Sequence, residues 1–222
     1  MYPHLVTERV RAKHDNTSGI AAEAAFSVNG ITAAGYVDAV TPIEVGPVVG
    51  LTLGALYRAT YFVSAGLVLH YGFLAPDGEE LDEEFGHFFA LLAEARGHYA
   101  FFDFFEPWVG LGLGYGTTMT KGEGSWSLFG VSGEGSMTLH GLALSLSVGA
   151  NFFITDAISV GPFFRMIVGG WTTFCTKSQR EVGGAFEVEP ECGDARDIYG
   201  FEPQHLPHLW TVGVVATYVF SL

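Results

Sequence analysis

Residues 137–171 read MTLHGLALSLSVGANFFITDAISVGPFFRMIVGGW, and this stretch decides the fold. After His140, large apolar residues occupy every second position, and small or polar residues occupy the positions between them. A period of two is typical of a β-strand. The large members are Leu142, Leu144, Leu146, Val148 and Phe152, and the small ones are Gly141, Ala143, Ser145, Ser147, Gly149 and Asn151.

The alternation resumes after Thr155 and Asp156, which indicates a turn and therefore a hairpin. Phe164 and Met166 continue the apolar face, and Arg165 lies on the opposite one. An ordinary solvated exterior would be rich in Lys and Glu, whereas the face opposite the large residues is mostly small and polar. We therefore expect the apolar face to meet lipid.

Composition supports strands that cross a membrane. The chain has 222 residues, enough for one domain, and its 30 Gly, 19 Phe and 9 Tyr favour short, tightly packed strands. No uninterrupted apolar run reaches the length of about 18 residues that a membrane helix needs. Only 15% of the residues are charged, yet the net charge is -14, which argues against nucleic acid as a partner.

The same alternation recurs before and after the hairpin of residues 137–171. It is clearest in residues 45–57, 61–71, 91–101, 109–115 and 210–220, and we expect a turn at about residues 103–107. Counted from Ala22, the pattern predicts an all-β fold: a closed antiparallel transmembrane β-barrel of about eight strands, with short periplasmic turns and longer extracellular loops. In the first strand, Asn29 and Gly30 break the parity and suggest a β-bulge.

Two segments divide the chain. Residues 1–20 read as a polar N-terminal lead-in, and residues 21–222 as the outer-membrane β-barrel domain. The beginning of the chain lacks the apolar core of a secretory signal, so we expect that a signal peptide has been removed. A cytoplasmic protein is the alternative.

A few charged residues fall on the inward parity of the predicted strands. Because buried charges must be paired and a barrel of this size is nearly filled by side chains, structural plugging is the first interpretation. A rearranging ion-pair gate would use the same residues. The candidate lumen charge cluster is Arg58, Glu94, Arg96 and Arg165, with Glu23 as a further inward charge.

Catalytic and metal sites are not indicated. No nucleophile and base are placed together, and the histidines are scattered without metal-ligand spacing. We therefore expect a non-enzymatic protein without catalytic residues, metal or cofactor. The histidines considered are His70, His87, His98, His140, His205 and His208.

The loops carry two further candidates. Cys175 and Cys192 are the only cysteines, and both lie in the long segment 175–207 before the last strand, so an exported protein should join them in a disulfide. A second, acidic loop offers oxygen ligands for divalent cations, although a solvated loop is the simpler interpretation. Its acidic residues are Asp77, Glu79, Glu80, Asp82, Glu83 and Glu84.

Three segments together resemble small bacterial outer-membrane barrels of the outer membrane protein A and outer membrane protein W type. They are PWVGLGLGYG at residues 107–116, NFFITDAISVGPFFR at residues 151–165, and a last strand with Thr211, Gly213 and alternating aromatic residues. The resemblance implies location in the bacterial outer membrane and insertion by the barrel-assembly machinery. The last strand departs from the family pattern because Ser221 and Leu222 follow Phe220.

Three function classes remain open. The first is a structural or surface-interaction module with acidic extracellular loops, whose partners would be outer-membrane lipid, lipopolysaccharide and an extracellular or envelope protein. The second is a narrow channel or lateral conduit for small or apolar molecules. The third, a soluble ligand-binding barrel of lipocalin type, would place its large apolar residues inside, so it fits the pattern least well.

Overall fold

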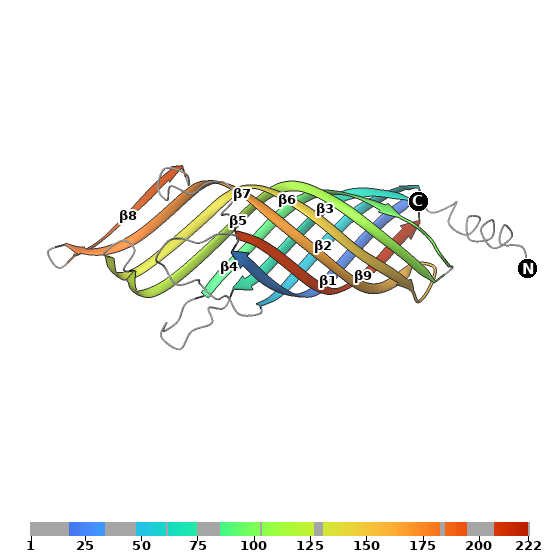
Figure 1. The fold of residues 1–222 in the computed structure, drawn as a ribbon, viewed down its shortest axis with the longest axis horizontal. Helices are drawn as coiled ribbons and strands as arrows, with labels where there is room; N and C mark the ends of the chain where they lie inside the picture. Colours follow the sequence, from blue (N-terminus) through green and yellow to red (C-terminus); the bar gives the residue numbers. More distant parts are fainter. Residues whose placement is uncertain are drawn as a thin grey trace, which may run out of the picture.

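The computed structural model describes residues 18–33, 48–60, 62–74, 85–102, 104–126, 131–182, 185–194 and 207–221. Its elements are all β-strands (Figure 1). They are β1 (Gly19–Ala33), β2 (Val48–Thr60), β3 (Val63–Leu74), β4 (Phe85–His98), β5 (Phe105–Trp126), β6 (Val131–Phe153), β7 (Ile158–Val182), β8 (Ala185–Asp194) and β9 (Pro207–Ser221). Within these ranges no helix is long and apolar enough to cross a membrane.

Eight strands close a barrel, as the alternation predicts. Strands β1 to β7 pair antiparallel in chain order, β7 then pairs with β9, and β9 returns to β1. The ninth strand, β8, lies outside this ring and pairs with the outer part of β7. Closure gives every strand of the ring a partner on both sides, which a sheet needs in hydrocarbon.

The strands are staggered around the barrel. Following paired residues once around the ring from Gly19 returns to β1 at Asn29, ten residues further along. Such a shear tilts the strands and turns each row of paired residues into a rising spiral. One inward row passes through Gly19, Arg58, Ser64, Arg96, Gly110, Ser147, Arg165, Thr211 and Asn29. The three arginines of this row therefore lie at successive heights in the lumen.

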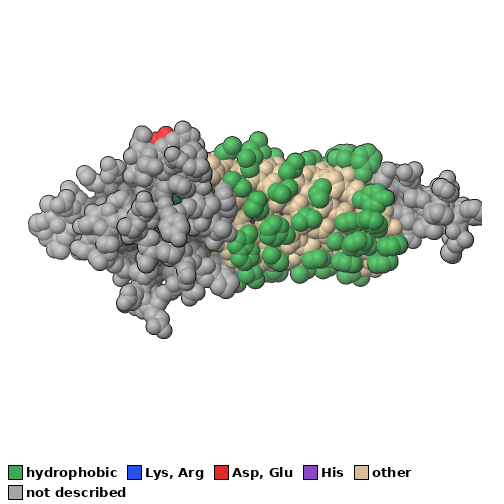
Figure 2. All heavy atoms as spheres, in the orientation of Figure 1, with side chains coloured by type: hydrophobic (Ala, Val, Ile, Leu, Met, Phe, Trp, Pro, Cys, Tyr) green, Lys and Arg blue, Asp and Glu red, His purple; other side chains and the backbone are tan. Residues whose placement is uncertain are grey.

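The predicted orientation of the strands is confirmed. On β6, Leu144 and Leu146 are 50% and 52% exposed, whereas Ala143 and Ser145, which alternate with them, are buried. Figure 2 shows hydrophobic side chains covering the described face of the barrel. Large apolar residues thus point outward to lipid, which rules out a barrel of lipocalin type.

Three short connections of the barrel lie at the same end (Figure 1). The connections β2–β3, β4–β5 and β6–β7 lie at the end where β1 begins and β9 ends, which is the periplasmic end of such barrels. In the β6–β7 turn, the Thr155 hydroxyl accepts hydrogen bonds from the backbone N–H groups of Ala157 and Ile158, at 3.3 and 3.0 Å. The turn predicted at Thr155 and Asp156 is therefore confirmed.

Two local predictions are wrong. Residues 175–207 are not one loop, because β7 continues to Val182 and β8 pairs with it. The first strand has no bulge at Asn29 and Gly30, since β1 pairs with β9 in continuous register. Asn29 points into the lumen, and the ring of Trp210 fills the space that a Cβ at Gly30 would occupy, so both residues fit a regular strand.

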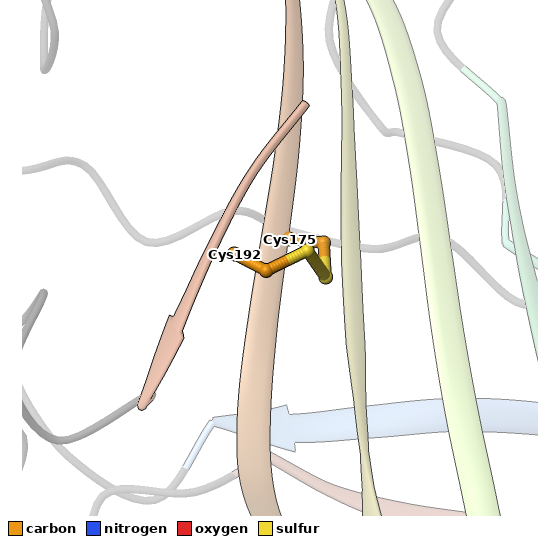
Figure 3. The surroundings of a disulfide bond; sticks show 2 residues. All are labelled: Cys175 and Cys192. Atoms are coloured by element: carbon orange, nitrogen blue, oxygen red, sulfur yellow. A yellow bond between two sulfur atoms is a disulfide. The ribbon is translucent and has the colours of Figure 1, made fainter. Parts of the chain in front are cut away.

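The disulfide between Cys175 and Cys192 is confirmed (Figure 3). The two residues are directly opposed in the β7–β8 pair, with a Cα–Cα distance of 4.1 Å. The disulfide therefore links β8 covalently to the outer part of β7. In the chain-entropy model, closing a loop of this size contributes about 3 kcal/mol.

The division of the chain at residue 21 stays a prediction. β1 begins at Gly19, two residues earlier. The lead-in itself, residues 1–17, lies outside the described residues, as does the acidic loop at residues 75–84.

Candidate functional site

Glu94 lies at the centre of a buried ion network in the lumen. Its Oε1 accepts a hydrogen bond from Arg96 Nε at 2.6 Å, and its Oε2 accepts one from Arg165 Nη2 at 2.7 Å. The hydroxyl of Ser147 donates a third at 3.3 Å. One carboxylate is thus shared between two guanidinium groups contributed by β4 and β7.

Glu23 completes this central network. Its Oε1 accepts from Arg96 Nη1 at 2.7 Å and from the Thr217 hydroxyl at 3.3 Å. We call Glu23, Glu94, Arg96 and Arg165 the central network; its two carboxylates balance its two guanidinium groups. The Arg96 guanidinium also lies 4.2 Å from the centre of the Trp108 ring, a cation–π contact. Buried charged side chains need partners of opposite charge and several hydrogen bonds, and the central network provides both.

The glycines of β5 make room for this network. A Cβ at Gly110 would lie 3.1 Å from both Arg96 Cγ and Glu94 Oε1, and 2.5 Å from Ser147 Oγ. Gly112 faces the lumen one step further along, beside Ser145. The glycine-rich segment at residues 107–116 therefore provides the inner space that the long charged side chains fill.

A second network lies nearer the periplasmic end. Arg58 forms an ion pair with Glu106, whose Oε1 is also 3.0 Å from His98 Nδ1 and 3.3 Å from Asn151 Nδ2. The other ring nitrogen of His98 lies 2.7 Å from the Ser64 hydroxyl. We call these five residues the periplasmic network. Arg58 and Glu106, the ion pair of this network, are also enclosed in the lumen.

Apolar side chains close the lumen on the extracellular side of the central network. β4 runs toward the periplasm, so Phe88, Ala90 and Leu92 lie on the extracellular side of Glu94, and they pack with residues from β6, β7 and β9. The full cluster is Phe88, Ala90, Leu92, Ala143, Ile167 and Leu209. Nearby, His70 is buried and hydrogen-bonds Thr52 at 2.8 Å.

These layers fill the described part of the lumen. Glu94 is 2% exposed and Arg165 1%, so protein atoms surround both side chains closely. A void of about 10 Å³ opens at the periplasmic end, lined in part by Arg58, Ser64 and His98. That space suits about one water molecule. The interior of the described strands is a packed core with a small periplasmic vestibule.

All four residues of the predicted lumen cluster face the interior, but they do not form one group. Glu94, Arg96 and Arg165 lie together with Glu23, whereas Arg58 pairs with Glu106 nearer the periplasm. The stagger of the strands separates them. The alternation along one strand shows which face of the sheet a residue occupies. It does not show how high in the barrel that residue lies.

Glu106 is the residue that sequence reasoning missed. Residues 103–107 read as a turn, yet β5 begins at Phe105, so Glu106 already points inward. Extending the glycine parity of Gly110 back through Trp108 would have placed Glu106 in the lumen. His98 shares the inward parity of Glu94 and Arg96, as the alternation predicts, and its ring lies in the periplasmic network.

No family model matches the sequence, and no curated protein matches it. Solved structures do. Neisserial surface protein A has 9% sequence identity and a TM-score of 0.54; the match covers 93% of this chain and 100% of that one.

A major outer membrane protein from Thermus thermophilus has 14% identity and a TM-score of 0.55, covering 90% of this chain and 99% of that one. This is the fold of the small bacterial outer-membrane barrels. The predicted resemblance is confirmed at the level of the fold, and the lipid-facing exterior agrees with the predicted outer-membrane location.

Proposed function

We propose that this outer-membrane barrel is a non-enzymatic scaffold that presents surface hairpins, and that its lumen conducts at most in small, infrequent events. The observation that most strongly supports this proposal is the central network, in which Glu94 is buried between Arg96 and Arg165. Charges that are paired and hydrogen-bonded inside a packed core fit a structural role. They are not exposed to a substrate, which also argues against catalysis in the lumen.

The outer ends of the strands remain available for binding. The β5–β6 pairing extends to Trp126 and Val131, beyond the last β4 pair at Phe85 and Lys121. The disulfide holds β8 against β7 in a second extension. A rigid scaffold that presents such segments is a common arrangement for recognition.

The charge of these segments favours a cationic partner. Acidic residues gather in the segments 77–84 and 181–202, and the chain as a whole carries a net charge of -14. Partners would be cationic protein surfaces, or lipopolysaccharide bridged by divalent cations. We propose the bridged lipopolysaccharide as the first partner to test, because it surrounds the hairpins in an outer membrane.

Removing the second extension should abolish this interaction. The variant lacks residues 177–196 and carries Cys175→Ser, and it is measured in phospholipid nanodiscs against immobilised lipopolysaccharide with and without Mg²⁺. We expect the intact chain to bind only with Mg²⁺, and the variant to bind about tenfold more weakly, a difference of about 1.4 kcal/mol.

A matched control separates charge from shape. Glu187→Gln, Glu189→Gln and Glu191→Gln together keep the hairpin and remove part of its charge, and this variant should also lose Mg²⁺-dependent binding. Retained heat-modifiable migration on gels would show that both barrels still fold. Equal binding by all three proteins, or binding that ignores Mg²⁺, would reject the proposed partner.

A further inference from the structure

The periplasmic network places three side chains in a row. The Ser64 hydroxyl oxygen lies 2.7 Å from His98 Nε2, and His98 Nδ1 lies 3.0 Å from Glu106 Oε1. The three residues come from β3, from the end of β4 and from the start of β5. Ser64 and His98 are 34 residues apart in the chain, so this contact is created by the pairing of neighbouring strands.

The carboxylate of Glu106 fixes the direction of these hydrogen bonds. Glu106 forms an ion pair with Arg58 and accepts a hydrogen bond from Asn151 Nδ2 at 3.3 Å. An ionised carboxylate only accepts, so the neutral ring of His98 carries its hydrogen on Nδ1. The Ser64 hydroxyl then donates to His98 Nε2. A serine that donates to a histidine oriented by a carboxylate is an activated nucleophile.

Space and a positive charge lie beside this hydroxyl. Ser64, His98 and Arg58 line the void of about 10 Å³ that opens at the periplasmic end. Arg58 and Ser64 are directly paired across β2 and β3, so they are neighbours on the inner face of the barrel. A carbonyl group attacked by Ser64 would develop its negative charge near the Arg58 guanidinium, and a nearby cation stabilises such an oxyanion.

His70, deeper in the barrel, offers a comparison within the same lumen. Its Nδ1 lies 2.8 Å from Thr52 Oγ1, and its Nε2 lies 3.5 Å from Thr211 Oγ1. Among the described residues no carboxylate contacts this ring, and the ring is fully buried. The need of a buried polar group for hydrogen-bond partners accounts for His70. The carboxylate and the opening toward the periplasm distinguish His98.

We propose that Ser64 is a covalent acylation site, which accepts one small acyl group from an activated ester that reaches the vestibule from the periplasm. The Ser64 oxygen forms a bond to the carbonyl carbon, and His98 Nε2 takes the hydroxyl proton. The bond between that carbon and the leaving oxygen then breaks, and His98 returns the proton to the leaving alcohol. The products are acylated Ser64 and a free alcohol, so no further reactant is needed.

The size of the void limits the reaction to one event. The void suits about one water molecule, so an acetyl group on Ser64 takes the place of the water that would otherwise release it. Ser64 therefore keeps its acyl group, and the barrel does not turn over the ester. A single acylation goes beyond the proposed scaffold function, leaves the scaffold non-enzymatic, and does not depend on binding at the surface hairpins.

The probe that tests this site is para-nitrophenyl acetate. The intact chain is folded into phospholipid nanodiscs, which leave the periplasmic opening accessible, and is incubated with the ester at neutral pH. Released para-nitrophenolate gives the number of groups transferred, and mass spectrometry of peptides locates the acetyl group. Ser64→Ala removes the nucleophile, and His98→Gln keeps a polar side chain without the base. Ser159→Ala is the matched control, because Ser159 lines the same void and contacts no histidine among the described residues.

We expect one stable acetyl group per barrel, located on Ser64, and none at this position in Ser64→Ala. His98→Gln should react about 100-fold more slowly, since a positioned general base contributes at least about this factor. Ser159→Ala should react like the intact chain. Heat-modifiable migration shows which variants are folded, and the position of the acetyl group in the intact chain tests the site without any variant.

Three results would overturn the proposal. The first is a folded, intact barrel that carries no acetyl group on Ser64. The second is a folded His98→Gln variant that reacts as fast as the intact chain, because the histidine would not be the base. The third is steady release of many equivalents of para-nitrophenolate, because the site would then turn over the ester.

Discussion

Replacing Glu94 with alanine should lower the free energy of unfolding by about 3 to 5 kcal/mol, because a broken buried ion pair leaves uncompensated charge in the core. Arg165 would lose its partner in the central network, and Arg96 would retain only Glu23. Urea unfolding in phospholipid vesicles, followed by tryptophan fluorescence, measures the change.

Ser147→Ala is the matched control because it removes only the 3.3 Å hydrogen bond to the same carboxylate. It should cost about 1 kcal/mol. Similar losses for the two variants would show that removing Glu94 leaves no uncompensated charge in the core. Replacing the whole network by Glu23→Gln, Glu94→Leu, Arg96→Met and Arg165→Met should restore much of the lost stability, since an apolar core of similar volume often equals a buried ion pair.

Leu144→Arg is expected to cost about 2 to 4 kcal/mol, because an arginine facing lipid near the bilayer midplane is strongly unfavourable. Leu144 lies on the outward face of β6, and Val168 and Leu113 are its paired neighbours on either side. The same unfolding measurement applies. Ser145→Ala on the inward face should change stability by about 1 kcal/mol or less.

Met119→Arg is the control for charge itself. Met119 is exposed two residues before Lys121, toward the outer end of β5, where arginine should cost only about 0 to 1 kcal/mol. Equal losses at Leu144 and Met119 would contradict the position of the membrane around the barrel.

Alternation was sufficient to predict most of the fold. On β6 the large residues Leu142 and Leu144 alternate with the small residues Ala143 and Ser145, so the two faces of the strand can be distinguished from the sequence alone. The small side chains also indicate a narrow interior. Strand number, antiparallel pairing and orientation follow from this pattern together with the need to satisfy every backbone group in lipid.

The contents of the lumen were harder to predict. Leu91 and Leu92 are adjacent and both apolar, and only the parity of the neighbouring residues shows that Leu91 faces lipid while Leu92 is buried inside. The inward face was expected to be small and polar, yet it includes Phe88, Phe163 and Ile167. A periodicity of two carries no information on how tilted strands combine such residues into layers.

The pairing of charges depends on the stagger of the strands, which is a property of the closed ring and not of any one strand. It brings Arg165 of β7 to Glu94 of β4, and leaves Arg58 to Glu106. Local sequence does not encode this height difference. The disulfide was accessible to prediction because the chain has only two cysteines.

Conductance in planar lipid bilayers tests most directly whether the lumen is a closed core. The intact protein is compared, under the same salt and voltage, with the variant Glu94→Gln, Arg96→Gln, in which both of these side chains are uncharged. We predict small, infrequent events from the intact protein and no steady open level, because the central network and the apolar cluster beyond it fill the interior. Steady, reproducible pores in the intact protein, with a conductance that changes when Glu94 and Arg96 are neutralised, would contradict a closed lumen and establish a channel.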